Sequence, residues 1–290
     1  MSMEKCLGNN GSLATTHRVT QSHPVRFHCI PIFLFLLFSF GKIPAAKCQT
    51  ASVFTQKIKN FTTDNLGNIY TLTLDNQVVK YTPEGVEQFR YPNRTFGEAS
   101  LLDATNPFQL LLFFPDYQTV LTLDRTLSVT GQFNLFQLGF QRARAVGTSS
   151  DGWLWVYDET SFLLKKITAD GTVMAQSGDL SLATGRPLHP VFLVEREQTV
   201  FLSDPEVGVL VFDAFGQYRK TIPLPGLTEF QVMDDQLVYF REGQLWSFHL
   251  TALLERPFSL PFELGQVAKV HVANGVLYAM ENGNLVAHRI

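Results

Sequence analysis

The stretch LGNIYTLTLDNQVVKYTPEG, residues 66–85, consists of two short runs in which apolar and polar residues alternate. The first run ends at Asp75-Asn76-Gln77, and the second ends at Pro83-Glu84-Gly85. Asn, Asp, Pro and Gly occupy tight turns, and alternation bounded by them is typical of a β-hairpin. The stretch therefore predicts two antiparallel strands joined by a short turn.

The hairpin pattern recurs along the chain. GWLWVYDETSFLLKKITADG (152–171) matches it almost position for position, and 110–131, 199–216, 236–250 and 275–290 follow the same plan, which gives six copies. Their turns lie at Asp75, Asp116, Asp158, Asp204, Arg241 and Glu281, with steps of 41, 42, 46, 37 and 40 residues. A period of about 40 residues with several short strands per unit is typical of β-propeller blades, which bury their faces only by stacking around a common axis.

Each unit also contains an inner strand before the hairpin, as in ARAVGTSS (143–150), and an outer strand after it, as in VEQFRY (86–91). The sixth copy ends at Ile290 after its third strand, which leaves an open edge. We expect SVFTQKIKNF (52–61) to supply the missing strand and close the ring. The sequence thus predicts an all-β, six-bladed β-propeller over residues 49–290. A six-unit sandwich or an open β-solenoid would also fit the pattern.

The N-terminal segment predicts export. Residues 30–40, IPIFLFLLFSF, form an apolar run too short to cross a bilayer as a helix, with Arg26 before it and small residues after it. This is the arrangement of a secretory signal peptide, cleaved after Cys48. We therefore assign residues 1–48 to a signal peptide with a long lead-in, and expect a periplasmic or extracellular protein without a transmembrane span. Lys47 stands where lipoprotein signals carry a small residue, which argues against a lipid anchor at Cys48.

Composition narrows the class of partner. Residues 49–290 contain 18 basic and 25 acidic residues, a net charge of −7. A domain this acidic is a poor partner for nucleic acid or for anionic membranes. All three cysteines precede residue 49, so disulfides do not stabilise the domain. Six units of about 40 residues leave no room for a second domain, and we expect a monomer.

The sequence contains few candidates for a catalytic motif. The sequence has no P-loop, no Cys-x-x-Cys and no His-Glu-x-x-His, so nucleotide, structural-zinc and zinc-protease sites lack their minimum parts. GTSSD (147–151) departs from a nucleophile elbow at Asp151 and is interpreted as a β-turn. A ring of turn carboxylates would suit a metal, but Asp at a hairpin turn has a simpler role, because it accepts backbone N–H groups two residues on. The sequence predicts no catalytic residue, no metal site and no cofactor.

Three long loops between units, 92–100, 135–144 and 178–190, carry the strongest signs of binding. In a propeller, loops that enter the inner strands share a face with the hairpin turns, around the mouth of the axial channel. Arg and Gln beside aromatic rings suit a protein segment or a polar small molecule. Solvated loops with incidental charges would explain the same composition. The candidate binding residues are Arg94, Phe96, Glu98, Gln141, Arg142, Arg144, Arg186 and His189.

The repeated plan Asp/Gly-Asn-x-Tyr-x-x-x-Asp, clearest in DNLGNIYTLTLDNQVVKYTPEG (64–85), resembles the NHL and related six-bladed β-propeller families, many of which are secreted bacterial proteins. The resemblance covers nearly all of residues 49–290 and concerns architecture. The chain lacks the Asn-x-Arg that usually follows the turn in NHL repeats, so the resemblance implies a fold and leaves the ligand open.

Two functions follow as hypotheses. The first is an exported, non-enzymatic binding scaffold for a protein or cell-envelope ligand. The second, implied by the similarity to six-bladed lactonases and gluconolactonases, is a metal-dependent hydrolase with a calcium-like ion in the channel. Such an ion needs carboxylate and amide oxygens that converge on the axis. The inner-strand ends offer Asp64, Asn65, Asp103, Glu195, Asp234 and Asn274. These residues form no recognisable ligand set, so the scaffold is the favoured hypothesis.

Overall fold

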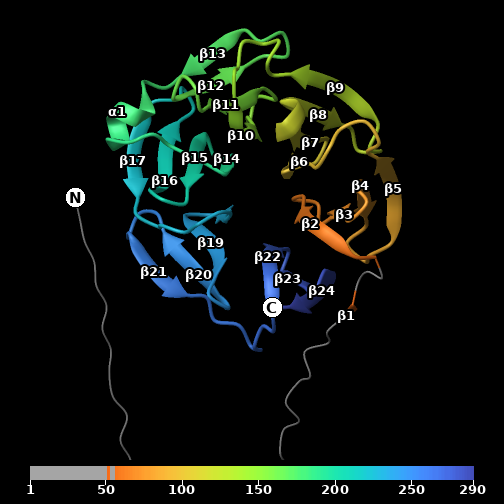
Figure 1. The fold of residues 1–290 in the computed structure, drawn as a ribbon. Helices are drawn as coiled ribbons and strands as arrows, with labels where there is room; N and C mark the ends of the chain where they lie inside the picture. The colour runs from red at the N-terminus through yellow and green to blue at the C-terminus, as the bar shows by residue number, and fades with distance from the viewer. Residues whose placement is uncertain (1–50, 53–55) are drawn as a thin grey trace, which may run out of the picture. The chain divides into compact units, whose positions relative to one another are not determined.

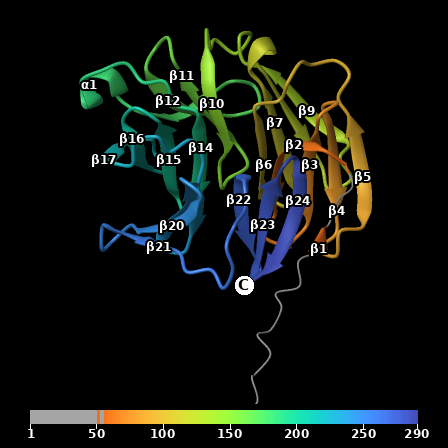
Figure 2. The ribbon, with the colours of Figure 1, turned by 60° about the horizontal axis from the view of Figure 1, so that its bottom comes forward.

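A computed structural model of the chain describes residues 51–52 and 56–290. It contains six four-stranded antiparallel sheets arranged around a central axis as a six-bladed β-propeller (Figures 1 and 2). The predicted fold is confirmed, and neither a sandwich nor an open solenoid describes the arrangement. The signal peptide assigned to residues 1–48, with its proposed cleavage site after Cys48, lies outside the described residues.

Each of the first five blades consists of four consecutive strands. Blade 1 contains β2 (Ile58–Thr63), β3 (Ile69–Thr73), β4 (Gln77–Tyr81) and β5 (Glu87–Pro92). Blade 2 contains β6 (Leu101–Asn106), β7 (Gln109–Phe114), β8 (Thr119–Leu123) and β9 (Val129–Asn134). Blade 3 contains β10 (Ala143–Thr148), β11 (Leu154–Asp158), β12 (Leu163–Ile167) and β13 (Val173–Gln176).

The remaining blades follow the same order. Blade 4 contains β14 (Phe192–Arg196), β15 (Thr199–Asp204), β16 (Gly208–Asp213) and β17 (Tyr218–Ile222). Blade 5 contains β18 (Gln231–Met233), β19 (Gln236–Arg241), β20 (Gln244–His249) and β21 (Leu254–Pro257). Blade 6 contains β22 (Val267–Ala273), β23 (Val276–Glu281), β24 (Asn284–Arg289) and β1 (Ala51–Ser52).

Within the part of the chain that the structure describes, helical structure is confined to loops. The segment η1 (Pro115–Tyr117) forms the central turn of blade 2, and α1 (Leu180–Thr184) lies in the loop 178–190. The sequence analysis missed α1, whose first turn is capped by the Asp179 carboxylate, which accepts the N–H of Ser181 (2.8 Å). Within residues 51–52 and 56–290, no helix has the length and apolarity needed to span a membrane.

The turn between β2 and β3 shows how polar residues shape the hairpins. The Asp64 carboxylate accepts the backbone N–H groups of Leu66 (3.0 Å) and Asn68 (2.8 Å) and the hydroxyl of Tyr70 (3.0 Å). Gly67 has a φ of 84°, which a residue with a Cβ rarely adopts. The Asp and Gly positions recognised in the sequence are therefore requirements of the turn.

The core lies between neighbouring blades. All five residues of β11 are buried, and they alternate between two interfaces. Trp155 and Tyr157 pack against blade 4, whereas Leu154 and Val156 pack against blade 2. Burial of each large apolar side chain contributes about 1.5–3 kcal/mol. A blade that is apolar on both faces is stable only with neighbours on both sides, which is why the ring must close.

The ring is closed by a shorter strand than the sequence predicts. Strand β1 pairs with β24, with Ala51 opposite Ala287, so the N-terminal end of the chain does complete the last blade (Figure 1). The assignment of 52–61 to this strand is wrong in its C-terminal half. Ile58 and Phe61 belong to β2, the inner strand of blade 1, because their side chains are buried between blades 1 and 6.

Candidate functional site

One face of the propeller, here called the rim, carries the loops 92–100, 135–144 and 178–190 together with the central hairpin turn of each blade. In blade 3 the Asp158 carboxylate accepts the backbone N–H of Arg142 (3.3 Å), and in blade 4 Asp204 accepts that of His189 (2.6 Å). Each Asp also accepts an N–H two residues later. The interpretation of these two carboxylates as turn residues is confirmed, and they also hold the incoming loops against the hairpins.

Three of the predicted binding residues converge on one carboxylate, Glu159. Its oxygens lie 3.0 Å from Arg142 Nε, 3.4 Å from Arg144 Nη1 and 2.6 Å from His189 Nδ1. The Glu159 side chain is 12% exposed, against 67% for Arg142 and 49% for His189, so the carboxylate lies beneath its partners. We call these four residues the Glu159 cluster. The sequence analysis missed Glu159, whose only signal is its position directly after the turn residue Asp158.

The other predicted residues do not join this cluster. Arg186 pairs with Glu206, and Glu98 pairs with Lys59. Phe96 is partly buried and packs against blade 2, with its ring 5.1 Å from that of Phe114. The remaining two are exposed, Arg94 and Gln141.

A groove of about 320 Å³ adjoins the Glu159 cluster. Its lining includes Pro115, Asp116, Gln118, Arg142, Arg144 and Val191. The Gln118 amide donates to the backbone carbonyl of Ala143 (3.0 Å) and accepts its N–H (2.6 Å), which ties blade 2 to blade 3. The groove therefore combines a held junction between two blades with one carboxylate and two guanidinium groups in its lining.

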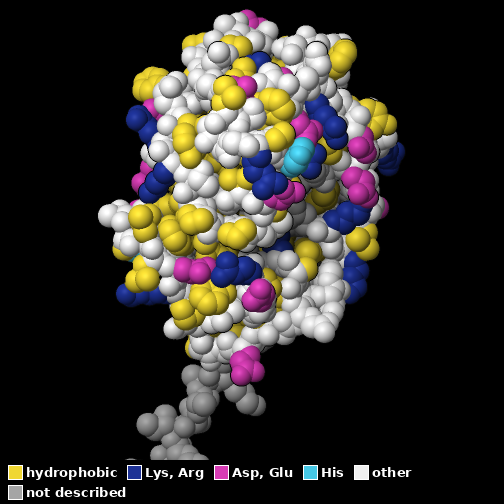
Figure 3. Space-filling model, turned by 60° about the vertical axis from the view of Figure 1, so that its left-hand side comes forward, with side chains coloured by type: hydrophobic (Ala, Val, Ile, Leu, Met, Phe, Trp, Pro, Cys, Tyr) yellow, Lys and Arg dark blue, Asp and Glu magenta, His cyan; other side chains and the backbone are white. Residues whose placement is uncertain are grey.

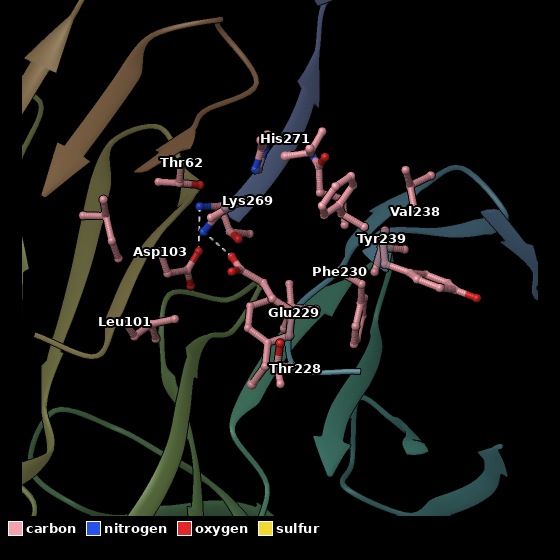
Figure 4. Close-up of a pocket in the computed structure, with 18 of the residues that line it drawn as sticks. Thr62, Leu101, Asp103, Thr228, Glu229, Phe230, Val238, Tyr239, Lys269 and His271 are labelled. Carbon is pink, nitrogen blue, oxygen red and sulfur yellow. Dashed lines mark hydrogen bonds and ion pairs between the residues drawn. The ribbon is translucent and has the colours of Figure 1, made fainter. Parts of the chain in front are cut away.

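A second cavity, of about 150 Å³, lies on the propeller axis (Figure 4). It is lined by residues of the inner strands β2, β6, β14, β18 and β22 and by the segment before β18. Lys269, on β22, contacts the carboxylate of Glu229, donates to Asn60 Oδ1 (2.7 Å), and lies 5.6 Å from the centre of the Phe61 ring. His271 lies one pleat further along the same strand and faces the same space.

The sequence analysis did not select this cavity, although a signal was present. In a strand, residues two positions apart share a face, so the polar pair Lys269 and His271 in an inner strand points toward the axis. Burial, together with the positive charges of Lys269 and Arg196, lowers the pKa of His271 to about 3. The imidazole is therefore neutral near pH 7 and offers one N–H donor and one nitrogen acceptor.

The carboxylates that a channel metal would need already accept hydrogen bonds from their own or a neighbouring blade. Asp103 accepts the N–H groups of Thr105 (2.8 Å) and Thr148 (3.1 Å). Glu195 accepts Ser149 Oγ (2.9 Å), and also Ser150 Oγ and Trp155 Nε1. Across residues 51–52 and 56–290, no three His, Cys, Asp or Glu side chains lie close enough together to hold a metal ion. The remaining predicted oxygen donors are exposed at turns, Asn65, Asp234 and Asn274.

On the face shown in Figure 3, neither basic nor acidic side chains form an extended patch. They are interspersed among hydrophobic and neutral side chains. Among the described residues, exposed ion pairs such as Arg219 with Asp213 and Arg186 with Glu206 also bring opposite charges together at the surface. Recognition at this surface therefore depends on local geometry more than on long-range attraction.

No family model matches the sequence, and no curated protein matches it. Many solved structures share the fold. Streptogramin B lyase is 13% identical over 81% of this chain and 83% of that chain, with a TM-score of 0.56. A catalytically inactive variant of virginiamycin B lyase from Staphylococcus aureus, with quinupristin, is 11% identical over 84% and 88%, with a TM-score of 0.56.

A protein of unknown function from Bacteroides thetaiotaomicron is 10% identical over 83% of this chain and 72% of that chain, with a TM-score of 0.55. At such identities the likeness shows the six-bladed fold alone. Because one fold of this kind hosts unrelated functions, the neighbours do not choose between an enzyme and a binding protein.

Proposed function

We propose that the chain is an exported, non-enzymatic binding scaffold that holds a protein or cell-envelope ligand at the rim. The observation that carries this proposal is the convergence of Arg142, Arg144 and His189 on Glu159 beside a preformed groove. Arg142 and His189 come from two loops, Arg144 from the start of β10, and Glu159 from the hairpin turn of blade 3. The backbone N–H groups of Arg142 and His189 donate to the Asp158 and Asp204 carboxylates, which fixes the two loops. A site held in this way loses little conformational entropy when a partner binds.

The chemistry of the groove favours a peptide-like ligand. Arg142 and Arg144 share one carboxylate, so both keep N–H donors for a second acceptor. Arg144 Nε is buried and has no hydrogen-bond partner among the described residues. Asp116, which also lines the groove, supplies an acceptor for a donor group. An extended segment presents alternating carbonyl and N–H groups. Its N–H groups can donate to Asp116, and its carbonyl groups or an acidic side chain can accept from the arginines.

The hydrolase hypothesis is the weaker one on the same geometry. Asp64, Asp103 and Glu195 each accept at least two hydrogen bonds from their own or a neighbouring blade. Turning any of them toward a metal would leave those donors without partners, which costs about 1–3 kcal/mol for each buried donor. The scaffold requires no such rearrangement.

Export is the second part of the proposal and rests on the apolar run 30–40 and the small residues that follow it. We expect protein purified from the native host to begin near Gln49. N-terminal sequencing and intact mass decide this, and a full-length soluble form in the cytoplasm would contradict it.

The binding surface is tested by affinity capture from the envelope fraction of the native host. The chain is compared with an Arg142→Ala/Arg144→Ala double variant and with Arg219→Ala, a control that removes an arginine paired with Asp213 away from the groove. We expect a discrete partner whose affinity falls about tenfold or more in the double variant and stays unchanged in the control. Equal capture by all three proteins would contradict the rim as the binding surface.

A further inference from the structure

The axial cavity is lined by a cation that forms no ion pair with the described residues. Arg196, the last residue of β14, lines the cavity and is partly buried. Among residues 51–52 and 56–290, no carboxylate pairs with its guanidinium group and no hydrogen bond from it is found. The other charged residues of the cavity differ in this respect, since Lys269 contacts Glu229 and Asp103 accepts two N–H groups. Arg196 is therefore the free charge of the cavity.

His271 gives the cavity a neutral polar group beside this charge. Its ring meets that of Phe61 edge-on, at 6.3 Å between centroids, and faces the axis (Figure 4). Lys269, Arg196 and His271 line the same cavity, and the positive charges of the first two both act to lower the pKa of His271. An anion beside Arg196 would thus meet a guanidinium group and an imidazole N–H without having to displace an acidic partner.

Size and wall chemistry limit the ligand. The cavity of about 150 Å³ matches an engineered protein cavity that holds benzene. Its apolar lining includes Leu102, Val194 and Val238. Glu229 and Asp103 line the same space and would repel a doubly charged phosphate more than a singly charged group. A planar carboxylate also matches the two parallel N–H groups of a guanidinium fork.

We propose that the axial cavity is a second site, which binds a small organic carboxylate about the size of benzoate. Arg196 pairs with the carboxylate, His271 donates a hydrogen bond to the ligand, and the apolar wall covers its hydrocarbon part. This site is independent of the rim and adds a small-molecule ligand to a protein that binds a larger partner elsewhere. Its occupancy gives a partly buried guanidinium group an anionic partner, which no described residue supplies.

The test uses matched pairs of carboxylate and amide, butyrate with butyramide and benzoate with benzamide, because each pair has one shape and differs in charge. Titration calorimetry and thermal melts compare the wild-type chain, Arg196→Gln, and the surface control Arg219→Gln. We expect at least one carboxylate to bind about tenfold or more tightly than its amide in the wild type and in the control. In Arg196→Gln the two members of that pair should bind equally weakly.

Three results would overturn the proposal. The first is that neither carboxylate binds up to about 20 mM, a concentration at which even a site with a millimolar dissociation constant would be occupied. The second is that the wild type binds acid and amide equally, and the third is that Arg196→Gln still prefers the acid. Tighter binding of inorganic phosphate than of both carboxylates would also contradict it. The Arg142→Ala/Arg144→Ala variant should bind the carboxylate as the wild type does, so failure at the rim and failure in the cavity are distinguishable.

Discussion

Two glutamates at blade junctions, Glu195 and Glu159, have opposite surroundings. Glu195 is 3% exposed and accepts hydrogen bonds from the neutral side chains of Ser149, Ser150 and Trp155. Glu159 contacts the guanidinium groups of Arg142 and Arg144 and the imidazole of His189, side chains that reach into solvent. The donors around Glu195 are committed to one acceptor and closed to a ligand, whereas those around Glu159 keep exposed N–H groups. One carboxylate holds blades together, and the other organises a surface for binding.

The largest effect should follow the loss of Glu195. In Glu195→Ala, three donors lose their buried acceptor, and we expect the free energy of unfolding to fall by about 3 kcal/mol or more. Glu195→Gln keeps one acceptor oxygen and nearly the same volume, so its loss should be about 1 kcal/mol. Denaturant unfolding measures both. If the free energy of unfolding of Glu195→Ala lies within about 0.5 kcal/mol of the wild type, Glu195 does not hold the blades together and the proposed difference between the two glutamates is wrong.

His271 should have a smaller effect on the free energy of unfolding, and this effect should depend on pH. Its pKa is about 3 in the folded chain and 6.5 without burial, so between these values the unfolded chain binds the extra proton. Stability should therefore fall as the pH drops below about 6.5, by at most about 1.4 kcal/mol per pH unit from this residue, and it gains nothing from His271 above that pH.

His271→Asn should flatten this dependence, whereas His249→Asn, which removes a half-exposed imidazole, should leave it in place. Unfolding titrations at several pH values between about 4 and 7.5 show the slopes. If His271→Asn keeps the slope of the wild type, the imidazole is not held neutral by its position in the cavity.

The smallest effect on stability should come from Glu159. Two of its three partners, Arg142 and His189, are exposed, and exposed ion pairs contribute at most about 1 kcal/mol each. Glu159→Gln should therefore lower the free energy of unfolding by less than about 1 kcal/mol, while releasing Arg142 and Arg144 and weakening the capture of a rim partner. A loss as large as that of Glu195→Ala would show that the cluster is structural, and the comparison would fail.

The sequence predicted what depends on local chemistry. Asp and Gly at turns, with alternating apolar residues, produced the blade count and order, because each blade repeats the same local rules. The closing strand was assigned too long because Ile58 and Phe61 alternate as any strand would, and only their burial between blades 1 and 6 assigns them to β2. Patterning shows that a strand exists but not which edge it joins.

The candidate site was predicted only where one loop carried several signals. Arg142 and Arg144 were selected for their charge within a long loop, but their partner Glu159 lies on a different element and was missed. The axial residues Lys269 and Arg196 come from different blades, and their common cavity depends on ring geometry. Contacts between blades that form only when the ring closes cannot be recognised in the sequence of a single repeat.

The central claim is that the rim holds the partner, and site-specific photo-crosslinking in the native host tests it most directly. A photoreactive residue at Gln141 probes the rim beside the Glu159 cluster, and one at Phe108, exposed in the turn between β6 and β7, probes the opposite face. We predict a discrete crosslinked product outside the cytoplasm from position 141 and none from position 108. Crosslinking at position 108 alone, or equally at both positions, would contradict the account.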